Sequence, residues 1–152
     1  MIDTTFEKPL PTNPEAERRV LGVILLDNAA LELAITTLDE SDFFSPPNRT
    51  AYGAMLALQG RGETIDPLSL KEELRRNGDL ERIGGDYYLQ SLFDGVGRFG
   101  NVESYAKLVR SAARERRLIT FADDVMRRAF DGDETLDDQL RQAEQELALI
   151  GA

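Results

Sequence analysis

The sequence predicts an all-α protein with three parts: an extended N-terminal tail (residues 1–12), a globular multi-helix head (13–100), and a C-terminal antiparallel helical hairpin (101–150) in the same structural domain. Two observations predict the head. Asparagine or aspartate followed by proline opens two apolar stretches with helical spacing, at Asn13-Pro14 and Asp66-Pro67, and glycine ends two of the head's stretches, at Gly60 and Gly78. A third observation predicts the hairpin, because residues 101–130 keep a helical pattern without proline or glycine.

The tail contains Pro9 and Pro11 and little periodicity, which predicts an extended segment. Asn13-Pro14-Glu15 then supplies an N-cap, a proline for the first helical position and an acid for the first turn. A helix is expected to begin there. After residue 19 almost every side chain is apolar, so we expect its second half to be buried on all sides.

Shorter helices should follow over residues 29–38 and 48–59, the second placed by the upstream Pro46 and Pro47 and ended by Gly60-Arg61-Gly62. Asp66-Pro67 repeats the cap-plus-proline start and predicts a helix over 67–76, which Gly78 closes. Residues 87–93 have helical spacing, although tyrosine and phenylalanine also suit a strand. We expect a helix there.

Asn101 caps the long pattern over residues 101–130, which corresponds to about 45 Å of helix. Asp131-Gly132-Asp133 should turn the chain into a return helix with a narrow apolar stripe, formed by Leu136, Leu140, Ala143, Leu147 and Ile150. An antiparallel arrangement around this turn would place Arg127 and Arg128 near Asp138 and Asp137. Exposed pairs of this kind would set the register more than the stability.

The long helix carries more apolar surface than one return helix can cover. Its apolar residues extend over about half the circumference at 100° per residue. Either the head folds back over the remainder, or a second hairpin from another subunit covers it. The candidate self-association and partner-binding residues are Leu118, Ile119, Phe121, Val125, Met126, Phe130, Leu140 and Leu147.

The charge balance does not favour nucleic-acid binding. There are 28 acidic residues against 18 Lys plus Arg, a net charge of −10 that repels a phosphate backbone. Arg110, Arg114, Arg116 and Arg117 form the one local basic excess, which we interpret as a solvated or ion-paired helix face. The absence of cysteine, of a signal-like start and of a long apolar run predicts a cytoplasmic protein without a membrane span.

No catalytic or cofactor constellation is expected. No glycine is directly followed by lysine, so the sequence lacks the Gly-Lys pair of the phosphate-binding loop of ATPases. Histidine is also absent, which removes a common catalytic base and metal ligand. Residues 95–100 match the pattern G-x-G-x-x-G but lack the flanking strands of a dinucleotide site, which favours a plain loop. Residues 131–135 resemble the start of a calcium loop but lack its later glycine and acid, which favours a turn.

Two further groups of residues have structural interpretations. The adjacent acids Glu72-Glu73, Asp123-Asp124 and Asp137-Asp138 point about 100° apart on helices, so we interpret them as solvated faces and not as shared acid–base pairs. The four tyrosines lie beside apolar neighbours and are expected to pack in the core or between subunits. They are Tyr52, Tyr87, Tyr88 and Tyr105.

Several motifs occur in a fixed order along nearly the whole chain. They are Leu10-Pro11-Thr12-Asn13-Pro14-Glu15-Ala16-Glu17, Val20-Leu21-Gly22, Ile24-Leu25-Leu26-Asp27, Asp42-Phe43-Phe44 before Arg49, Gly62-Glu63-Thr64-Ile65-Asp66, Gly84-Gly85 with Tyr88-Leu89, and Asn101-Val102-Glu103-Ser104-Tyr105-Ala106-Lys107-Leu108-Val109. Together they resemble the N-terminal domain of bacterial replicative DNA helicases of the DnaB family. One departure is the loop over 95–100, where the family commonly has small residues and proline.

The resemblance implies a helical head with a dimerising hairpin, in which six copies form a collar as a trimer of dimers. It also implies that the collar binds primase and supports loading and ring assembly, which makes a helicase loader a further candidate partner. ATP and magnesium would belong only to a motor domain placed after residue 150, and this chain would need no cofactor. The alternatives are a helicase-binding domain of a primase, a stand-alone helicase-regulating adaptor and, remotely, a small carboxylate-based metal-dependent enzyme.

Overall fold

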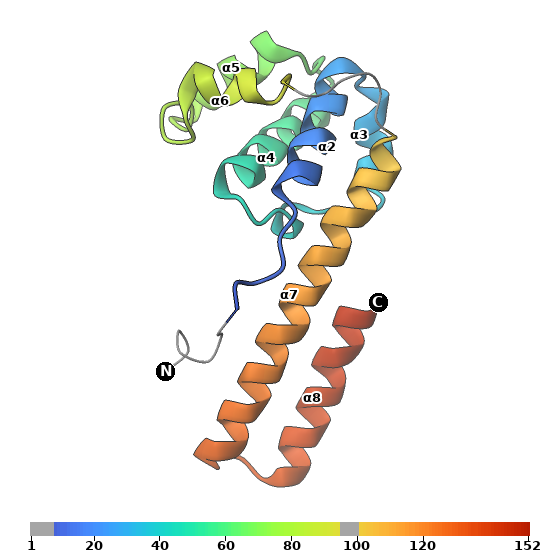
Figure 1. Cartoon of the computed structure of the whole chain (residues 1–152), viewed down its shortest axis with the longest axis vertical. Helices are drawn as coiled ribbons and strands as arrows, with labels where there is room; N and C mark the ends of the chain where they lie inside the picture. Colours follow the sequence, from blue (N-terminus) through green and yellow to red (C-terminus); the bar gives the residue numbers. More distant parts are fainter. Residues whose placement is uncertain (1–7, 95–100) are drawn as a thin grey trace. The chain divides into compact units, whose positions relative to one another are not determined.

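The computed structural model describes residues 8–94 and 101–152, and within these residues the chain forms seven α-helices, one 3₁₀ helix and no strand (Figure 1). The predicted all-α class is confirmed. In chain order the elements are α2 (Pro14–Leu26), α3 (Ala29–Ala34), η1 (Glu40–Asp42), α4 (Pro46–Gly60), α5 (Pro67–Arg76), α6 (Gly85–Ser91), α7 (Val102–Asp131) and α8 (Leu136–Gly151).

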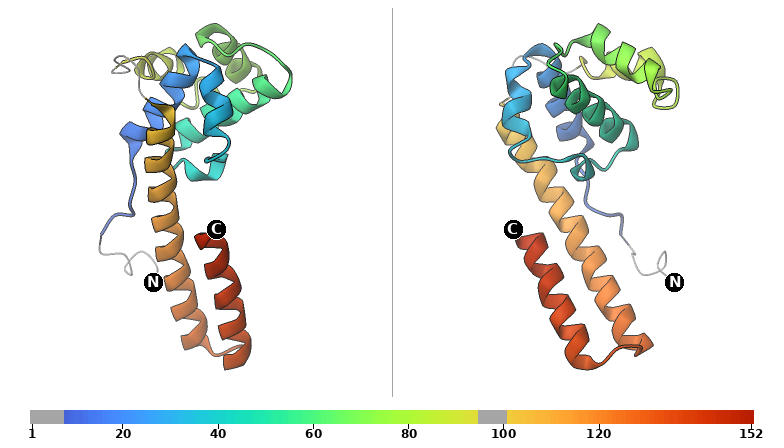
Figure 2. Two further views of the ribbon diagram at one scale, coloured as in Figure 1. Left: turned by 90° about the vertical axis from the view of Figure 1, so that its right-hand side faces the viewer. Right: turned by 180° about the vertical axis from the view of Figure 1, so that it is seen from behind.

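The chain divides into two compact units, and α7 contributes to both. One unit, called the head here, consists of residues 13–110. In the described part of the chain the other unit joins residues 8–12 to residues 111–152, and its two helical arms are called the hairpin (Figure 2). The functional division of the chain at residue 101 stays a prediction. The glycine-rich segment over residues 95–100 lies outside the described residues.

The helix starts follow the predicted caps. Asn13 Oδ1 accepts a hydrogen bond from Ala16 N at 3.0 Å, and Asp66 Oδ1 accepts one from Ser69 N at 2.8 Å. Asn101 Oδ1 accepts one from Glu103 N at 2.9 Å. α4 begins earlier than predicted, because Pro46 and Pro47 form its first turn instead of preceding it.

Two helix ends differ from the prediction. α3 ends at Ala34 and not at residue 38, and the Thr36 hydroxyl donates to the carbonyl of Leu33 at 2.7 Å just beyond this end. Such a local side-chain bond competes with helix continuation. α6 is a helix, as expected, but it begins at Gly85 and ends at Ser91, whereas 87–93 was predicted.

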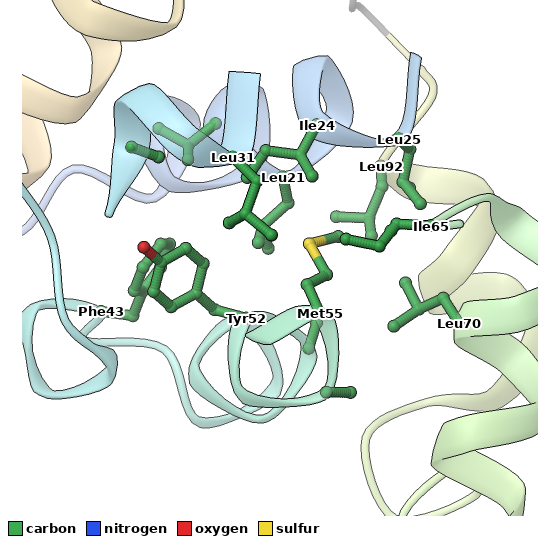
Figure 3. Close-up of a cluster of buried hydrophobic side chains, with 14 of the residues drawn as sticks. Leu21, Ile24, Leu25, Leu31, Phe43, Tyr52, Met55, Ile65, Leu70 and Leu92 are labelled. Atoms are coloured by element: carbon green, nitrogen blue, oxygen red, sulfur yellow. The ribbon is translucent and has the colours of Figure 1, made fainter. Parts of the chain in front are cut away.

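The core of the head lies where α2, α3 and α4 face one another (Figure 3). Leu21 and Ile24 of α2 point toward Met55 of α4, and all three side chains are buried. The second half of α2 is therefore largely buried as predicted, apart from Val23, which is partly buried, and Leu26, which is exposed. Apolar burial of this extent is what holds short helices together in one unit.

A buried carboxylate links α2 to the start of α4. Glu17 accepts hydrogen bonds from Phe44 N at 2.8 Å, Ser45 N at 3.2 Å and Asn48 Nδ2 at 3.0 Å. The Tyr88 hydroxyl donates to Asn48 Oδ1 at 2.7 Å and extends this network to α6. Because α4 opens with two prolines, the nearest backbone N–H groups come from the two residues before them. The carboxylate satisfies those donors at the positive end of the helix.

The sequence motifs of the head hold its loops in place. The Arg49 guanidinium donates to the carbonyl of Phe43 at 3.0 and 3.1 Å, and the Phe43 ring lies 4.6 Å from the Tyr52 ring between centroids. Asn28 pairs with the backbone of Ile65 in both directions, accepting from its N–H at 2.8 Å and donating to its carbonyl at 2.6 Å. Side chains thus replace the backbone partners that these extended segments lack.

The C-terminal end of α4 is joined to α5 by an ion pair whose carboxylate is buried and whose guanidinium is partly exposed. Glu73 is buried, and its Oε1 lies 2.6 Å from Arg61 Nη2. The hydrogen bond from Arg61 lowers the pKa of Glu73 below its ordinary value. The expectation that Glu72 and Glu73 form a solvated face is therefore wrong for Glu73, because a distant arginine compensates its burial.

The tyrosines divide into packed and exposed side chains. Tyr52 is fully buried and donates to the Leu38 carbonyl at 3.0 Å, and burial raises the pKa of its phenol. Tyr88 is partly buried, and the Arg19 guanidinium lies 5.6 Å from the ring centroid of Tyr105. Tyr87 is exposed, so it does not pack in the core, and packing between subunits stays a prediction at this position. Tyr87 and Tyr88 point about 100° apart on α6, and only Tyr88 is turned toward the core.

Candidate docking surface of the hairpin

The hairpin turns at Gly132, whose φ of 68° lies in the left-handed region that favours glycine. The predicted turn at residues 131–133 is confirmed, since α7 ends at Asp131 and α8 begins at Leu136. Thr135 caps α8 by accepting a hydrogen bond from Asp138 N at 3.2 Å. Figure 2 shows the two arms side by side in both views.

One side of α7 faces α8. Arg114 Nε donates to the carbonyl of Ile150 at 3.0 Å, and Arg128 Nη1 lies 3.1 Å from Glu146 Oε1. These arginines are 14 residues apart and so lie within about 40° of each other around the helix. The inner face therefore follows a 4-3-4-3 spacing, as in a coiled-coil seam. Its residues are Arg114, Leu118, Phe121, Val125 and Arg128.

The opposite side of α7 forms a second seam with 3-4-3-4 spacing. Each position on it follows an inner-face position by two or five residues and thus points about 160° or 140° away from that position. Arg116 and Asp123 belong to it, two residues after Arg114 and Phe121. The residues of this outer face are Arg116, Ile119, Asp123, Met126 and Phe130.

The eight candidate residues fall on both faces and on α8, and many of them are exposed. Phe121, Val125 and Ile119 are half-buried, whereas Leu118, Met126 and Phe130 are exposed. On α8, Leu140 and Leu147 keep 54% and 48% of their surface accessible, and no residue of this helix is buried. By helix phase these residues of α7 span one arc of about half the circumference, and only the inner part of this arc faces α8.

The predicted ion pairs across the turn are wrong. Arg127 lies on the outer side and pairs within α7, with Asp123 Oδ2 at 3.0 Å and with Asp124. Arg128 pairs with Glu146 and not with Asp137. The reason is helical phase: adjacent arginines point 100° apart, so only one of the two can face α8. Asp138 instead pairs with Arg141 one turn further along α8, at 2.9 Å.

Sequence reasoning missed Asp123, which was interpreted as solvated. It is 5% exposed, its Oδ2 accepts from Arg127 Nε at 3.0 Å, and its Oδ1 has no hydrogen-bond partner. A signal was available, because Asp123 occupies one position of the second apolar seam. A single polar residue at a seam position usually has a specific partner.

Three arginines of the basic cluster interact with other groups of the same chain. Arg110 lies 3.6 Å from Asp42 in the head, and Arg114 and Arg116 donate to backbone carbonyls. This agrees with the interpretation of an ion-paired or solvated face. Over residues 8–94 and 101–152, no group of three or more Asp and Glu side chains could hold a metal ion. Among the described helices, none combines the length and apolarity needed to cross a membrane.

The fold combines a small helical head with a two-helix hairpin, and a comparison with protein families identifies the class of protein. The DnaB-like helicase N-terminal domain matches residues 9–111, and the chain belongs to this family. The structure of the N-terminal domain of DnaB helicase from Mycobacterium tuberculosis is similar with a TM-score of 0.86 and 34% identity, covering 92% of this chain and 99% of that one.

Two further relatives extend the comparison. The replicative DNA helicase DnaC of Bacillus subtilis (strain 168) is 36% identical over 144 residues, which is 95% of this chain but 32% of the relative. The chain thus spans about a third of the length of this curated relative. The N-terminal domain of DnaB helicase from Helicobacter pylori has a TM-score of 0.66 and 25% identity over 76% of this chain and 89% of that one. Its structure is described together with its interactions with primase.

Proposed function

We propose that this chain is a collar domain of a hexameric replicative DNA helicase, which pairs with further copies through the hairpin and docks primase. Family membership supports the role, and the relative from Helicobacter pylori supports primase as the partner class. A helicase loader is a second proposed partner. The function would be exercised in the cytoplasm, and ATP and magnesium would be bound by a motor domain and not by these residues.

The main support for self-association is the exposed apolar side of α8. This helix has a leucine stripe and yet no buried residue, with Leu140 and Leu147 about half exposed. Two helices can cover only one side of each other, whereas four helices enclose such stripes in a common core. Each large apolar side chain buried there would contribute roughly 1.5 to 3 kcal/mol. A pair of hairpins would therefore offset part of the cost of association.

The first test is the mass of the chain in solution. We expect at least a dimer by light scattering at about 100 μM, and a shift to monomer when Leu140→Asp and Leu147→Asp are combined. The matched control is Leu149→Asp, because Leu149 is more exposed but lies about 180° from Leu140 on α8. Helicity by circular dichroism should be the same in all variants. A purely monomeric unsubstituted chain would refute hairpin pairing.

The second test concerns primase. Leu118 and Phe130 are exposed at the edges of the hairpin's apolar surface, where apolar anchors surrounded by charge would suit a docking site. Leu118→Asp or Phe130→Asp should weaken binding of the cognate primase's C-terminal domain at least tenfold, about 1.4 kcal/mol, without changing the oligomer's mass. Calorimetric titration measures this.

The matched control for docking is Leu108→Asp, because Leu108 on α7 is 49% exposed and Leu118 is 48% exposed. It should bind primase normally. Unchanged affinity in both hairpin variants would remove the hairpin as the docking site. A helicase-binding domain of a primase would instead prefer a helicase collar over its own kind, so mixing the chain with such a collar separates that alternative.

A further inference from the structure

The tip of the hairpin, residues 129–138, exposes two large apolar side chains beside one turn (Figure 2). Phe130 at the end of α7 is 83% exposed, and Leu136 at the start of α8 is 68% exposed. Leu136 precedes the half-buried positions of α8, which begin at Gln139. Single exposed apolar residues are common on protein surfaces, but neighbouring ones form the kind of patch that contacts a partner.

The surroundings of these two side chains are acidic. Residues 129–138 contain five carboxylates and no lysine or arginine. Asp138 pairs with Arg141, and the preceding Arg127 and Arg128 pair with carboxylates outside the tip. In the described part of the chain, the other carboxylates of the tip have no ion-pair partner. They are Asp131, Asp133, Glu134 and Asp137.

The stability of the two helices accounts for only part of this acidity. Asp137 lies in the first turn of α8, where the positive end of the helix favours a carboxylate. Asp131 is the last residue of α7, where the partial negative charge of the helix end opposes a carboxylate. Asp133 and Glu134 lie in the connection between the helices. The exposed Phe130 ring and the acids around the turn are therefore features that helix formation does not require.

The turn that presents these groups is held by hydrogen bonds at both of its ends. The N–H of Gly132 donates to the carbonyl of Arg128 at 3.1 Å. Gln139 Nε2 donates to the carbonyl of Glu134 at 2.9 Å. A surface that is ordered before binding avoids the entropy cost of ordering a loop, so the tip is suited to recognition.

We propose that the tip docks a partner protein through a basic segment, in which lysine or arginine side chains surround apolar ones. Phe130 and Leu136 contact the apolar side chains, while Asp131, Asp133 and Glu134 pair with the cations. Nucleic acids and anionic lipid surfaces are repelled by the same carboxylates, as is a second tip. This docking shares Phe130 with the proposed primase surface but does not require primase as the partner.

A basic peptide tests the role of the carboxylates. The probe is a fluorescent peptide of about 18 leucine and lysine residues, which forms about five turns of amphipathic helix. Fluorescence anisotropy measures its affinity for the chain. The combined substitutions Asp131→Gln, Asp133→Asn and Glu134→Gln should weaken binding at least about tenfold, because they remove three ion pairs at once.

The matched control neutralises three exposed carboxylates outside the tip, with Glu32→Gln, Glu115→Gln and Glu144→Gln. It changes the net charge of the chain by the same amount, so it should alter the affinity less than about twofold. Equal weakening by the two triple variants would overturn the docking, because binding would then follow net charge alone. Equally tight binding of a peptide with glutamate in place of lysine would overturn it too.

The apolar contact has its own pair of variants. Phe130→Ala should weaken peptide binding at least about fivefold, at unchanged helicity by circular dichroism. Leu149→Ala removes a side chain of similar exposure, 77%, from the other end of α8 and should bind the peptide normally. Equal affinities of these two variants, or no binding by the unsubstituted chain, would overturn the docking. A lower oligomer mass of the triple tip variant would overturn it as well and assign the tip to a second copy.

Discussion

The head and the hairpin differ in how far their apolar side chains are buried and in whether their buried carboxylates have hydrogen-bond donors. In the head, the buried Glu17 and Glu73 have donors from other elements, and the apolar side chains of α2 and α4 enclose each other. In the hairpin, no residue of α8 is buried and the one buried carboxylate lacks a donor on Oδ1. The head therefore encloses its apolar core and pairs these buried carboxylates, whereas the hairpin leaves apolar side chains exposed.

The difference follows from geometry. Several short helices can surround a shared interior, but two long antiparallel helices meet along a single seam. α7 has two seams, and α8 covers only the inner face. The same helix thus contributes Val102, Ala106 and Val109 to the closed core of the head and exposes Met126 and Phe130 further along. Exposed apolar surface and core are here consecutive stretches of one helix.

The largest expected effect is in the head, at Glu17. Glu17→Ala would leave Phe44 N, Ser45 N and Asn48 Nδ2 without their acceptor. Each buried unsatisfied donor costs about 1 to 3 kcal/mol, so we expect the free energy of unfolding to fall by about 3 kcal/mol. Urea denaturation followed by circular dichroism measures this change.

The control is Glu15→Ala in the same helix, whose carboxylate is exposed and pairs with Arg18 and Arg19. Exposed pairs contribute about 0 to 1 kcal/mol, so this variant should unfold nearly as the unsubstituted chain does. Similar losses in both variants would contradict the view that the head is specified by its buried polar network.

Local signals allowed most of the fold to be predicted from the sequence. The caps at Asn13-Pro14, Asp66-Pro67 and Asn101 act within a few residues, and the structure uses all three. The burial of Glu17 and Glu73 could not be predicted, because their partners Phe44 and Arg61 are 27 and 12 residues away. Because charged side chains are mostly exposed, sequence alone predicts that they are solvated, and only the fold shows which of them have a buried donor.

The candidate surface was predicted only in outline. The apolar residues of α7 were recognised, but the ion pairs of Arg127 and Arg128 were placed by their distance from the turn and not by helical phase, so both received the wrong partners. The sequence does contain the two heptad spacings that start at Arg114 and Arg116. Which of them α8 would cover depends on the phase at which the turn at Gly132 returns the chain, and helix periodicity alone does not give that phase.

The second prediction compares the two regions directly by amide hydrogen exchange. Because α8 buries no side chain, local opening should cost less there than in α4, where Tyr52 and Met55 are fully buried. At concentrations where the chain is monomeric, protection of α8 amides should be about a hundredfold lower, which corresponds to about 2.7 kcal/mol. Raising the concentration should increase protection in α8 and leave α4 unchanged. Equal protection in both helices at low concentration would contradict the comparison.

The smallest expected effect is the acid sensitivity of the head through Glu73. Arg61 holds the pKa of Glu73 below its ordinary value of 4.5, so the unfolded chain binds this proton more readily than the folded chain. The stabilisation is fully present above that ordinary value and is lost as the pH falls through the folded pKa. Glu73→Gln should therefore reduce the unfolding free energy at neutral pH and flatten its decline between about pH 5 and 3.

The matched control is Glu63→Gln, which removes the other carboxylate bonded to Arg61, at 2.7 Å on the exposed side of the same guanidinium. Because an exposed pair adds little, its decline toward low pH should stay close to that of the unsubstituted chain. Urea denaturation of the three chains at a series of pH values gives the comparison. Parallel declines for Glu73→Gln and the unsubstituted chain would mean that the acid response of the head originates elsewhere than at the ion pair between α4 and α5.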